Sequence, residues 1–321
     1  MTAATAVQPP KLSFERAEAL VFDPIPSNRT TAHTALRMLG FYQLNASSAF
    51  DEATTVLRDT MIDLFVADVT HDPASVCRLV RALRDGSIGR NPFLHIVLMT
   101  WKLEGELVEK ALNCGADDLL TRPFSVDFLG ARLRAHTETR KPFVITSDYI
   151  GPDRRKGRAP EAGAQLMEVP NLMLAKAQDP QWPERSARLA LEAIKAGRVK
   201  VNAERVRKSA FQIAFLTHSL RDAFKAVAPL DGDLAKLEAV AKDLGARVEG
   251  HAAEMDALRL VSALRGDVAG AQSGENVATH VEQLSETAGA LLEKLNPERP
   301  REALLQEVAA AFAQAKTRRK S

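Results

Sequence analysis

Short apolar runs alternate with amphipathic stretches along the first part of the chain, up to about residue 140. The runs predict buried strands, and the stretches, whose apolar residues recur every three or four positions, predict helices. The predicted strands span residues 19–23, 42–47, 62–68, 93–100 and 117–121, and the predicted helices span residues 29–40, 50–60, 74–86, 104–116 and 126–138. Because a strand followed by a helix returns to its sheet by a right-handed crossover, this order predicts a doubly wound α/β domain with a parallel five-stranded sheet.

The second half has a different pattern, in which strand signals nearly vanish between about residues 184 and 318. Ala, Leu, Glu, Lys and Arg dominate there, and three breaks divide the stretch into three or four helices. This pattern predicts a C-terminal all-α helical bundle. The expected organisation is a disordered lead at 1–15, the α/β domain at 16–140, a linker or arginine-containing arm at 141–183, a helical output or dimerisation domain at 184–297, and a terminal helix with a basic tail at 298–321.

The composition is that of an ordinary globular protein, with 45% hydrophobic and 26% charged residues. A net charge of +2 and the acids interspersed along the helical half, which lacks a helix-turn-helix pattern, disfavour DNA as a partner. Neither Cys77 nor Cys114 belongs to a cluster with metal-ligand spacing, so both are expected to be reduced thiols. No apolar run is long enough to span a membrane and the N-terminus lacks a signal-peptide pattern, so a cytoplasmic location is expected.

Polar residues stand where four of the predicted strands end. These residues are Asp23, Asp68, Thr100 and Arg122. Ligands and chemistry collect beyond the carboxyl ends of the strands in an open parallel sheet. The sequence therefore predicts a site with two carboxylates, a hydroxyl group and a guanidinium group at one edge of the sheet.

Residues 16–140, about 40% of the chain, resemble the receiver domain of bacterial response regulators. The four strand-end residues carry the resemblance, together with the segment "GADDLLTRPF" (115–124), which is similar to the family's "GAxxYLxKPF" pattern. The resemblance implies a flavodoxin-like fold and a signalling protein of a two-component phosphorelay, not an enzyme. A histidine kinase or phosphotransfer protein, a downstream protein partner and a homodimer formed through the helical half are the expected partners.

The resemblance also implies a role for each residue of the site. Asp68 is expected to accept a phosphoryl group, Thr100 to act as the switch, and Arg122 to contact the phosphoryl oxygens in place of the family's lysine. A Mg²⁺ ion, which prefers oxygen ligands, is expected on Asp23, Asp68 and the backbone carbonyl of Thr70.

The chain departs from the family pattern at several of these positions. Pro24 replaces the second of two adjacent acids, so metal binding is expected to be weakened. Arg122 keeps the positive charge of the family's lysine, but on a guanidinium group that is broader than an ammonium group. Trp101 is large where small residues are typical. The other differences are Asp72, Pro73 and Val76 in the loop after the third predicted strand and Leu119 in place of an aromatic switch residue. Two interpretations stay open: Asp68 accepts phosphate through an altered site, or the domain is a pseudo-receiver that serves as a non-phosphorylated scaffold.

The segment "DYIGPDRRKGR" (148–158) contains a basic cluster formed by Arg154, Arg155, Lys156 and Arg158. Guanidinium groups bind phosphates through paired hydrogen bonds, so the cluster is a candidate anion site, including for a cyclic dinucleotide. The alternative is a solvated basic linker.

Residues 211–227 predict a helix that is apolar on two faces, with His218 opposite its main stripe. The segment weakly resembles the H-box of histidine-kinase dimerisation domains through His218, Leu220 and Arg221. Ser219 stands where that pattern has an acid, and no nucleotide-binding motif follows, so a working kinase is excluded. His218 is a candidate phosphotransfer histidine, and the alternative is an ordinary bundle histidine.

Overall fold

A computed structural model describes residues 12–146, 148–154, 166–179, 181–249 and 254–318. The chain divides into two compact units, Met1–Val201 and Asn202–Ser321. The boundary lies inside the long helix α7 (Glu184–Lys225), so each unit includes part of that helix. No helix in the described ranges is both long enough and apolar enough to cross a membrane.

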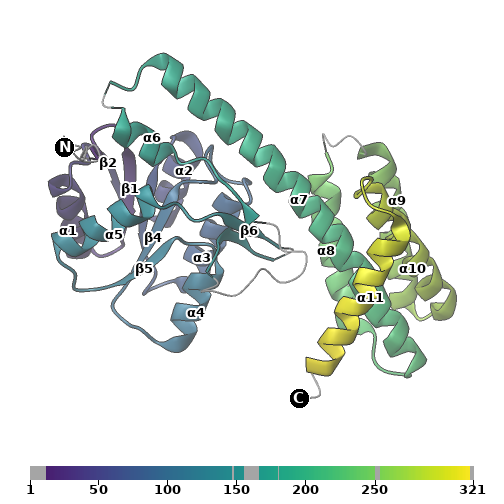
Figure 1. The fold of residues 1–321 in the computed structure, drawn as a ribbon. Coiled ribbons are helices and arrows are strands. Elements are labelled where there is room, and N and C mark those ends of the chain that lie inside the picture. Colours follow the sequence, from purple (N-terminus) through teal and green to yellow (C-terminus); the bar gives the residue numbers. More distant parts are fainter. Residues whose placement is uncertain (1–11, 147, 155–165, 180, 250–253, 319–321) are drawn as a thin grey trace, which may run out of the picture. The chain divides into compact units, whose positions relative to one another are not determined.

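The first unit is built on a parallel sheet whose five strands lie in the order β2-β1-β3-β4-β5 (Figure 1). The strands are β1 (Glu18–Phe22), β2 (Gln43–Ser47), β3 (Leu64–Asp68), β4 (His95–Thr100) and β5 (Asp118–Thr121). Every residue of β3 and β4 is buried, because helices cover both faces of the sheet. The predicted doubly wound α/β fold is confirmed.

Helices on both faces enclose two hydrophobic cores. The helices are α1 (Pro26–Met38), α2 (Phe50–Asp59), α3 (Pro73–Arg84), α4 (Gly105–Asn113) and α5 (Val126–Glu138). One core joins α2, α3 and α4 to the sheet through residues such as Leu57, Val80 and Ala111. The other core joins α1 and α5 to the opposite face through residues such as Leu36 and Leu133. This sandwich leaves the carboxyl ends of the strands at one edge.

Local side-chain caps set the starts of α3 and α5. The Asp72 carboxylate accepts a hydrogen bond from the backbone N–H of Ser75 at 2.9 Å, and Pro73 occupies the first turn of α3. Ser125 caps α5 by accepting a hydrogen bond from the N–H of Phe128 at 3.1 Å. The unusual residues in the loop after β3 thus form a helix start.

The described residues between 141 and 183 form a folded extension of the first unit, which differs from the predicted linker. Strands β6 (Phe143–Ile145), β7 (Ile150–Pro152) and β8 (Leu166–Met167) form an antiparallel sheet in the order β7-β6-β8, and helix α6 (Leu172–Gln178) follows. The extension contacts the α/β domain at Gly115, which faces the carbonyl oxygen of Ile150. Gly115 has φ +101°, and a Cβ at this position would clash with that oxygen. Strands of two or three residues carry no periodic pattern, so this sheet could not be predicted from the sequence.

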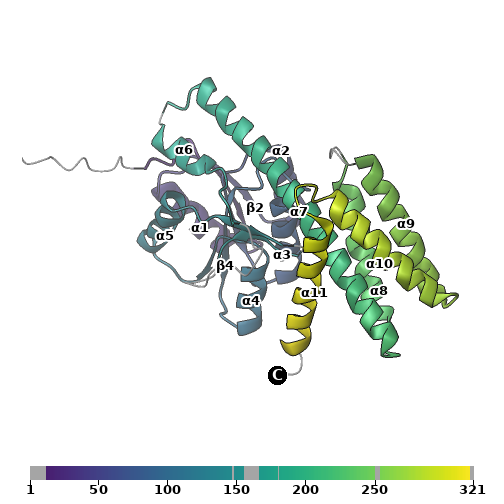
Figure 2. The ribbon, with the colours of Figure 1, turned by 45° about the vertical axis from the view of Figure 1, so that its right-hand side comes forward.

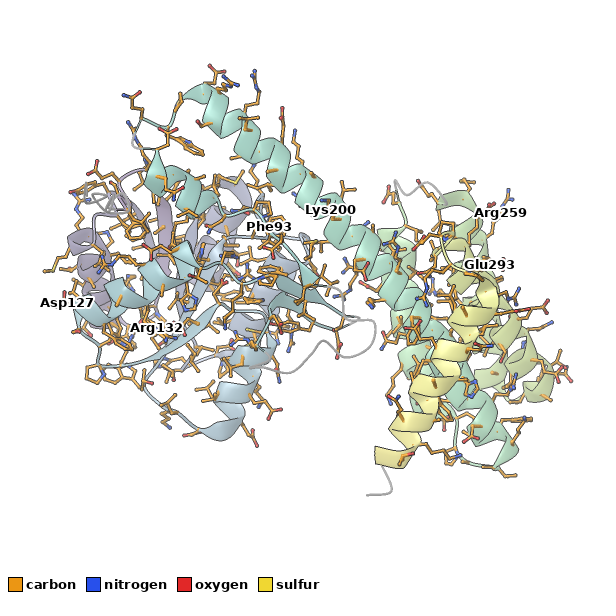
Figure 3. The ribbon with its side chains drawn as sticks, in the orientation of Figure 1. Phe93, Asp127, Arg132, Lys200, Arg259 and Glu293 are labelled. Carbon is orange, nitrogen blue, oxygen red and sulfur yellow. The ribbon has the colours of Figure 1, made fainter. Side chains whose placement is uncertain are left out.

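The N-terminal part of α7 also belongs to the first unit, although residues 184–201 were predicted to lie in the helical domain. Ile194 and Val201 pack in a hydrophobic cluster with Phe93, which Figure 3 labels, and Phe143. The ring of Phe93 also lies against Gly197, where a Cβ would be 2.7 Å from a ring carbon. A continuous helix hides this boundary from sequence patterns, since the chain has no break there.

The second unit is a helical bundle formed by the rest of α7 and four further helices. These are α8 (Asp231–Arg247), α9 (Glu254–Ser273), α10 (Val277–Lys294) and α11 (Arg301–Arg318), of which α8, α9 and α10 lie side by side (Figure 2). Ile213, Leu237 and Leu264 belong to the single core cluster of this unit. Leu304 and Val308 of α11 belong to the same cluster, so the predicted terminal helix is a member of the bundle.

Candidate functional site

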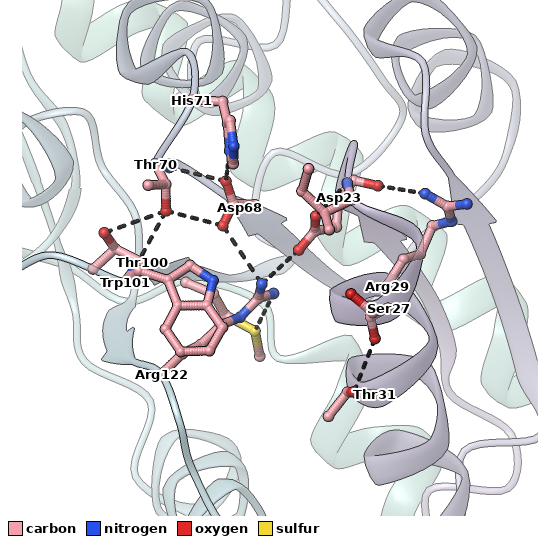
Figure 4. Close-up of polar contacts among 12 residues, drawn as sticks. Asp23, Ser27, Arg29, Thr31, Asp68, Thr70, His71, Thr100, Trp101 and Arg122 are labelled. Carbon is pink, nitrogen blue, oxygen red and sulfur yellow. Dashed lines mark hydrogen bonds and ion pairs between the residues drawn. The ribbon is translucent and has the colours of Figure 1, made fainter.

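The four strand-end residues predicted from the sequence meet at the carboxyl edge of the sheet (Figure 4). Asp23 follows β1, Asp68 ends β3, Thr100 ends β4 and Arg122 follows β5. All four are buried. The backbone N–H of Arg122 donates to the carbonyl oxygen of Thr100 at 2.8 Å, which continues the pairing of β4 with β5 one residue past its end. The predicted convergence of these residues is therefore present in the fold.

The Asp68 carboxylate is held by the residues that follow it in the chain. Its Oδ1 accepts a hydrogen bond from the backbone N–H of Thr70 at 3.0 Å and lies 3.2 Å from Nδ1 of His71. Its Oδ2 accepts a hydrogen bond from the Thr70 hydroxyl at 3.1 Å. Thr70 thus contacts Asp68 through its N–H and hydroxyl groups, whereas the sequence assigned it a carbonyl role.

Thr100 links the site to the loop that leads into α4. Its hydroxyl donates to the carbonyl oxygen of Lys102 at 3.0 Å, accepts from the N–H of Lys102 at 3.1 Å and lies 3.5 Å from the hydroxyl of Thr70. The N–H of Trp101 donates to the same Thr70 hydroxyl at 3.3 Å. The two threonine hydroxyls therefore connect the Asp68 carboxylate with the first residues after β4.

Arg122 lies between the two carboxylates. Its Nη1 is 2.6 Å from Oδ2 of Asp23 and 3.6 Å from Oδ2 of Asp68. Its Nη2 donates to Sδ of Met99 at 3.4 Å. The guanidinium therefore points into the acidic pair, where the sequence predicted a contact with phosphoryl oxygens.

Asn28, which was not predicted from the sequence, completes the surroundings of the guanidinium. With its amide oxygen turned toward these donors, Asn28 accepts from Nη1 of Arg122 at 2.9 Å and from the indole N–H of Trp101 at 3.2 Å. Asn28, Trp101 and Arg122 line a small cavity of about 140 Å³ together with Ser27, Thr31, Pro123 and Phe124. His71, three residues after Asp68, was also missed because it belongs to no recognisable motif, whereas Asn28 reaches the site only through the fold.

Asp23 is held at the start of α1. Its Oδ1 accepts a hydrogen bond from the N–H of Ile25 at 2.8 Å, and its carbonyl oxygen accepts from Nη1 of Arg29 at 2.6 Å. Its Oδ2 has the ion pair with Arg122 but accepts no hydrogen bond from any residue that the structure describes. A buried carboxylate oxygen without a hydrogen bond is costly, so this atom calls for an explanation.

The residues of the site do not fit the predicted Mg²⁺ ion. The described part of the chain contains no group of three His, Cys, Asp or Glu residues that could hold a metal. Pro24 contributes no carboxylate, and the guanidinium of Arg122 lies between the two that remain, Asp23 and Asp68. Mg²⁺ requires near-octahedral oxygen ligands and keeps several waters, for which this arrangement leaves no room.

The predicted anion cluster lies elsewhere and is only partly described. Arg154 donates from its Nη2 to the carbonyl oxygen of Ala116, at the opposite edge of the sheet from Asp68. Arg155 and Arg158 lie outside the described residues. Because Arg154 is engaged with the backbone of its own unit, this contact favours a structural role for it.

His218 lies on α7 in the second unit and is partly exposed. Its ring centroid is 4.8 Å from that of Phe312 on α11. Burial and the nearby Arg221 lower its pKa, which favours the neutral imidazole. A neutral, partly exposed histidine suits both interpretations of this residue, so its role stays a prediction.

The chain is similar to known regulatory proteins, although no family model matches it. It is 27% identical over 188 residues to the transcriptional regulatory protein YvrH of Bacillus subtilis, covering 51% of this chain and 76% of that protein. It is 32% identical over 116 residues to the phosphate regulon transcriptional regulatory protein PhoB of Pseudomonas aeruginosa, covering 36% of this chain and 49% of PhoB. The chain thus spans about half the length of the PhoB relatives that it matches.

Solved structures of similar proteins include a response regulator from Thermotoga maritima, with 24% identity and a TM-score of 0.34, covering 38% of this chain and 98% of that one. Another is the chemotaxis protein CheY4 of Vibrio cholerae, with 23% identity and a TM-score of 0.33, covering 37% of this chain and 96% of that one.

Taken with the strand order and the four strand-end residues, the sequence relatives define the class of the first unit as a receiver domain of the response-regulator type. The relatives themselves are transcriptional regulatory proteins. The helical unit is not identified by these relatives.

Proposed function

We propose that Asp68 is the phosphoryl acceptor of this regulator and that the helical unit carries its output. The observation that supports this most directly is the position of the Asp68 carboxylate, at the carboxyl edge beside a buried cation, Arg122, and two hydroxyl groups, those of Thr70 and Thr100. These are the groups that a transferring phosphoryl group needs around it.

The chemistry is a single displacement at phosphorus. An Asp68 carboxylate oxygen attacks the phosphorus atom of a phosphohistidine or an acyl phosphate, and the new O–P bond forms as the bond from phosphorus to the donor breaks. The donor keeps the bonding electron pair, so the histidine ring or the carboxylate is released. Arg122 and the N–H of Thr70 offset the negative charge that gathers on the phosphoryl oxygens, and the hydroxyl of Thr100 donates to one of them.

The same contacts supply a route for the signal. A phosphoryl oxygen that recruits the Thr100 hydroxyl takes it from the carbonyl oxygen of Lys102, which it holds in the unmodified protein. The Thr70 hydroxyl likewise anchors the N–H of Trp101. Phosphorylation would therefore rearrange the loop between β4 and α4. A histidine kinase or phosphotransfer protein as donor, a downstream protein partner, a homodimer and a cytoplasmic location complete the proposal.

A second candidate function is a pseudo-receiver that binds its partner without being phosphorylated. It is favoured by the position of Arg122, which already neutralises part of the charge of Asp23 and Asp68 in the unmodified protein. In that case the ion pairs would fix one conformation of the site for docking.

Intact-mass measurement distinguishes the two functions. The full chain is incubated with a small acyl phosphate in two parallel samples, one with a divalent cation and one with a chelator. The proposal expects a gain of one phosphoryl group that Asp68→Asn abolishes. The matched control is Asp127→Asn, which changes an exposed aspartate on α5 and should leave the gain intact (Figure 3). No gain under any condition, including with a phosphorylated histidine donor, would favour the pseudo-receiver.

A further inference from the structure

The guanidinium of Arg122 lies between the buried carboxylates of Asp23 and Asp68. We infer that Arg122 is the resident cation of this site and that it excludes a divalent ion, with Asn28 and Trp101 as positioning residues. The inference concerns the site of the proposed function and rests on it for its biological meaning. The binding property itself can be tested whether or not Asp68 is phosphorylated.

The geometry places a single nitrogen atom where a shared metal ion would lie. Nη1 of Arg122 is 2.6 Å from one Oδ2, that of Asp23, and 3.6 Å from the other, that of Asp68. A Mg²⁺ ion bound to both oxygens requires distances of about 2.0–2.1 Å to each. Such an ion would overlap the space of this nitrogen and face its positive charge at close range, so the two cations exclude each other.

The surroundings keep the guanidinium in place. The Asn28 amide oxygen accepts from Nη1, and the same oxygen accepts from the indole of Trp101, which fixes the amide. Nη2 is bonded to Met99 on β4, and the Arg122 side chain is only 6% exposed. These partners lie on three sides of the buried guanidinium, so they hold it between the two carboxylates.

The charges lead to the same conclusion. A guanidinium group is ionised at every ordinary pH, so it supplies its charge to Asp23 and Asp68 permanently, whereas a bound metal dissociates. Position 24, which would complete an acidic triad, is a proline. The site therefore has a built-in cation and lacks the third carboxylate that would favour a second one.

Binding of Mn²⁺, followed by the electron paramagnetic resonance signal of the free ion, tests this with the full chain. The wild-type protein should not bind Mn²⁺ at Asp68, so any saturable binding that it shows should be the same in Asp68→Asn. Arg122→Ala should acquire such a site, and adding Pro24→Asp should tighten it at least tenfold. Arg122→Lys keeps the positive charge and should bind Mn²⁺ much more weakly than Arg122→Ala.

Asn28→Ala tests the positioning role, because a freed guanidinium should admit Mn²⁺ to a measurable degree without a loss of helical content by circular dichroism. The matched control is Arg132→Ala, since Arg132 also pairs with an aspartate, Asp118, but at 45% exposure and outside the site. The control should leave Mn²⁺ binding unchanged.

Saturable binding by the wild-type protein that Asp68→Asn abolishes would overturn the inference. So would the absence of binding in a folded Arg122→Ala protein, and if Arg122→Ala does not fold, the absence of binding in folded Asn28→Ala decides in its place. These outcomes are separate from the proposed function. A phosphoryl gain in the presence of chelator supports both the proposed function and the exclusion of a metal ion. If the protein neither gains a phosphoryl group nor binds Mn²⁺, only the proposed function is refuted.

Discussion

The amino-terminal ends of the parallel strands form an amino edge of the sheet, and their carboxyl-terminal ends form the carboxyl edge. Both edges hold buried aspartates paired with cations, but the contacts of these cations differ. At the amino edge, Arg84 donates from three of its nitrogens to the carbonyl oxygens of Gly115, Pro92 and Leu94 and to the Asp117 carboxylate, at 2.7–2.8 Å. At the carboxyl edge, the guanidinium of Arg122 has one hydrogen bond to a sulfur atom, one to an amide oxygen and two ion pairs. Each guanidinium nitrogen of Arg84 thus donates to a protein oxygen, whereas Arg122 donates to one sulfur atom and one amide oxygen.

The source of the cations differs as well. At the amino edge, Arg140 comes from beyond α5, and Lys176 comes from α6, so the ion pairs fasten the extension to the sheet. Arg140 and Arg84 also lie over the ring of Phe143 on β6, with their guanidinium carbons 5.4 and 5.1 Å from its centroid. At the carboxyl edge the cation follows β5 and belongs to the same sheet as the two aspartates. The first arrangement is suited to stability, and the second leaves carboxylates available for chemistry.

The largest effect is expected from Asp117→Ala. This change leaves Arg84 and Arg140 buried without their shared carboxylate, which should lower the free energy of unfolding by about 4 kcal/mol in urea titrations. Asp127→Ala on the exposed side of α5 is the control and should change it by less than about 0.5 kcal/mol. A loss below about 1 kcal/mol for Asp117→Ala would remove the contrast between the edges.

Lys176→Met should have the next largest effect, about 3 kcal/mol. The Lys176 ammonium lies 2.6 Å from the carboxylate of Asp63, which also accepts the N–H of Glu18 at 2.7 Å. Burial raises the pKa of Asp63 above its usual range, and Lys176 opposes this, so Asp63 is left with an uncompensated burial cost in the variant. Thermal and urea unfolding of Lys176→Met and of the double variant with Asp63→Asn check this, and the double variant should regain most of the loss.

A third effect is a dependence on pH between about 6.5 and 5. Burial, with a smaller contribution from Arg140, holds the pKa of His95 well below its ordinary range. The unfolded chain therefore binds a proton below about pH 6.5 that the folded protein does not, and stability falls as the pH falls. The slope from this residue is at most about 1.4 kcal/mol per pH unit.

His95→Gln should flatten that dependence, since glutamine does not titrate. The difference between the two proteins isolates His95 from the other histidines. Asp117 does not interfere in this range: burial by itself raises its pKa, but Arg140, Arg84 and His95 outweigh that and hold it below its usual range, so its contribution is lost only below about pH 4. An unchanged pH dependence of the free energy of unfolding in His95→Gln would show that the lowered pKa of His95 does not cause it.

The smallest effect is expected from Asp68→Asn. Asparagine keeps an oxygen for the N–H of Thr70, and the loss of the 3.6 Å ion pair with Arg122 is offset by weaker repulsion from Asp23. The free energy of unfolding should change by less than about 1 kcal/mol, measured beside Asp117→Ala under the same conditions. A loss as large as that of Asp117→Ala would mean that the carboxyl edge is also a structural anchor.

Much of the receiver domain could be predicted because its signals are local. Buried parallel strands such as β3 and β4 are continuous apolar runs, and each is followed by a helix whose period is visible. The extension could not be predicted, because β6, β7 and β8 have at most three residues each and depend on distant partners such as Gly115. Asn28 was missed for the same reason, since its partners Trp101 and Arg122 are distant in the chain, whereas His71 is close to Asp68 and was missed because no motif marks it.

The sequence by itself determined which groups stand at the carboxyl edge: Asp23, Asp68, Thr100 and Arg122 each follow from a strand's end. Only the tertiary structure decided where the guanidinium points. Its direction depends on Asn28 and Met99, which lie on α1 and β4 far from Arg122 in the chain, and a side chain's rotamer is selected by such packed neighbours. In the unmodified protein the guanidinium lies between the carboxylates of Asp23 and Asp68, a position that no strand pattern specifies.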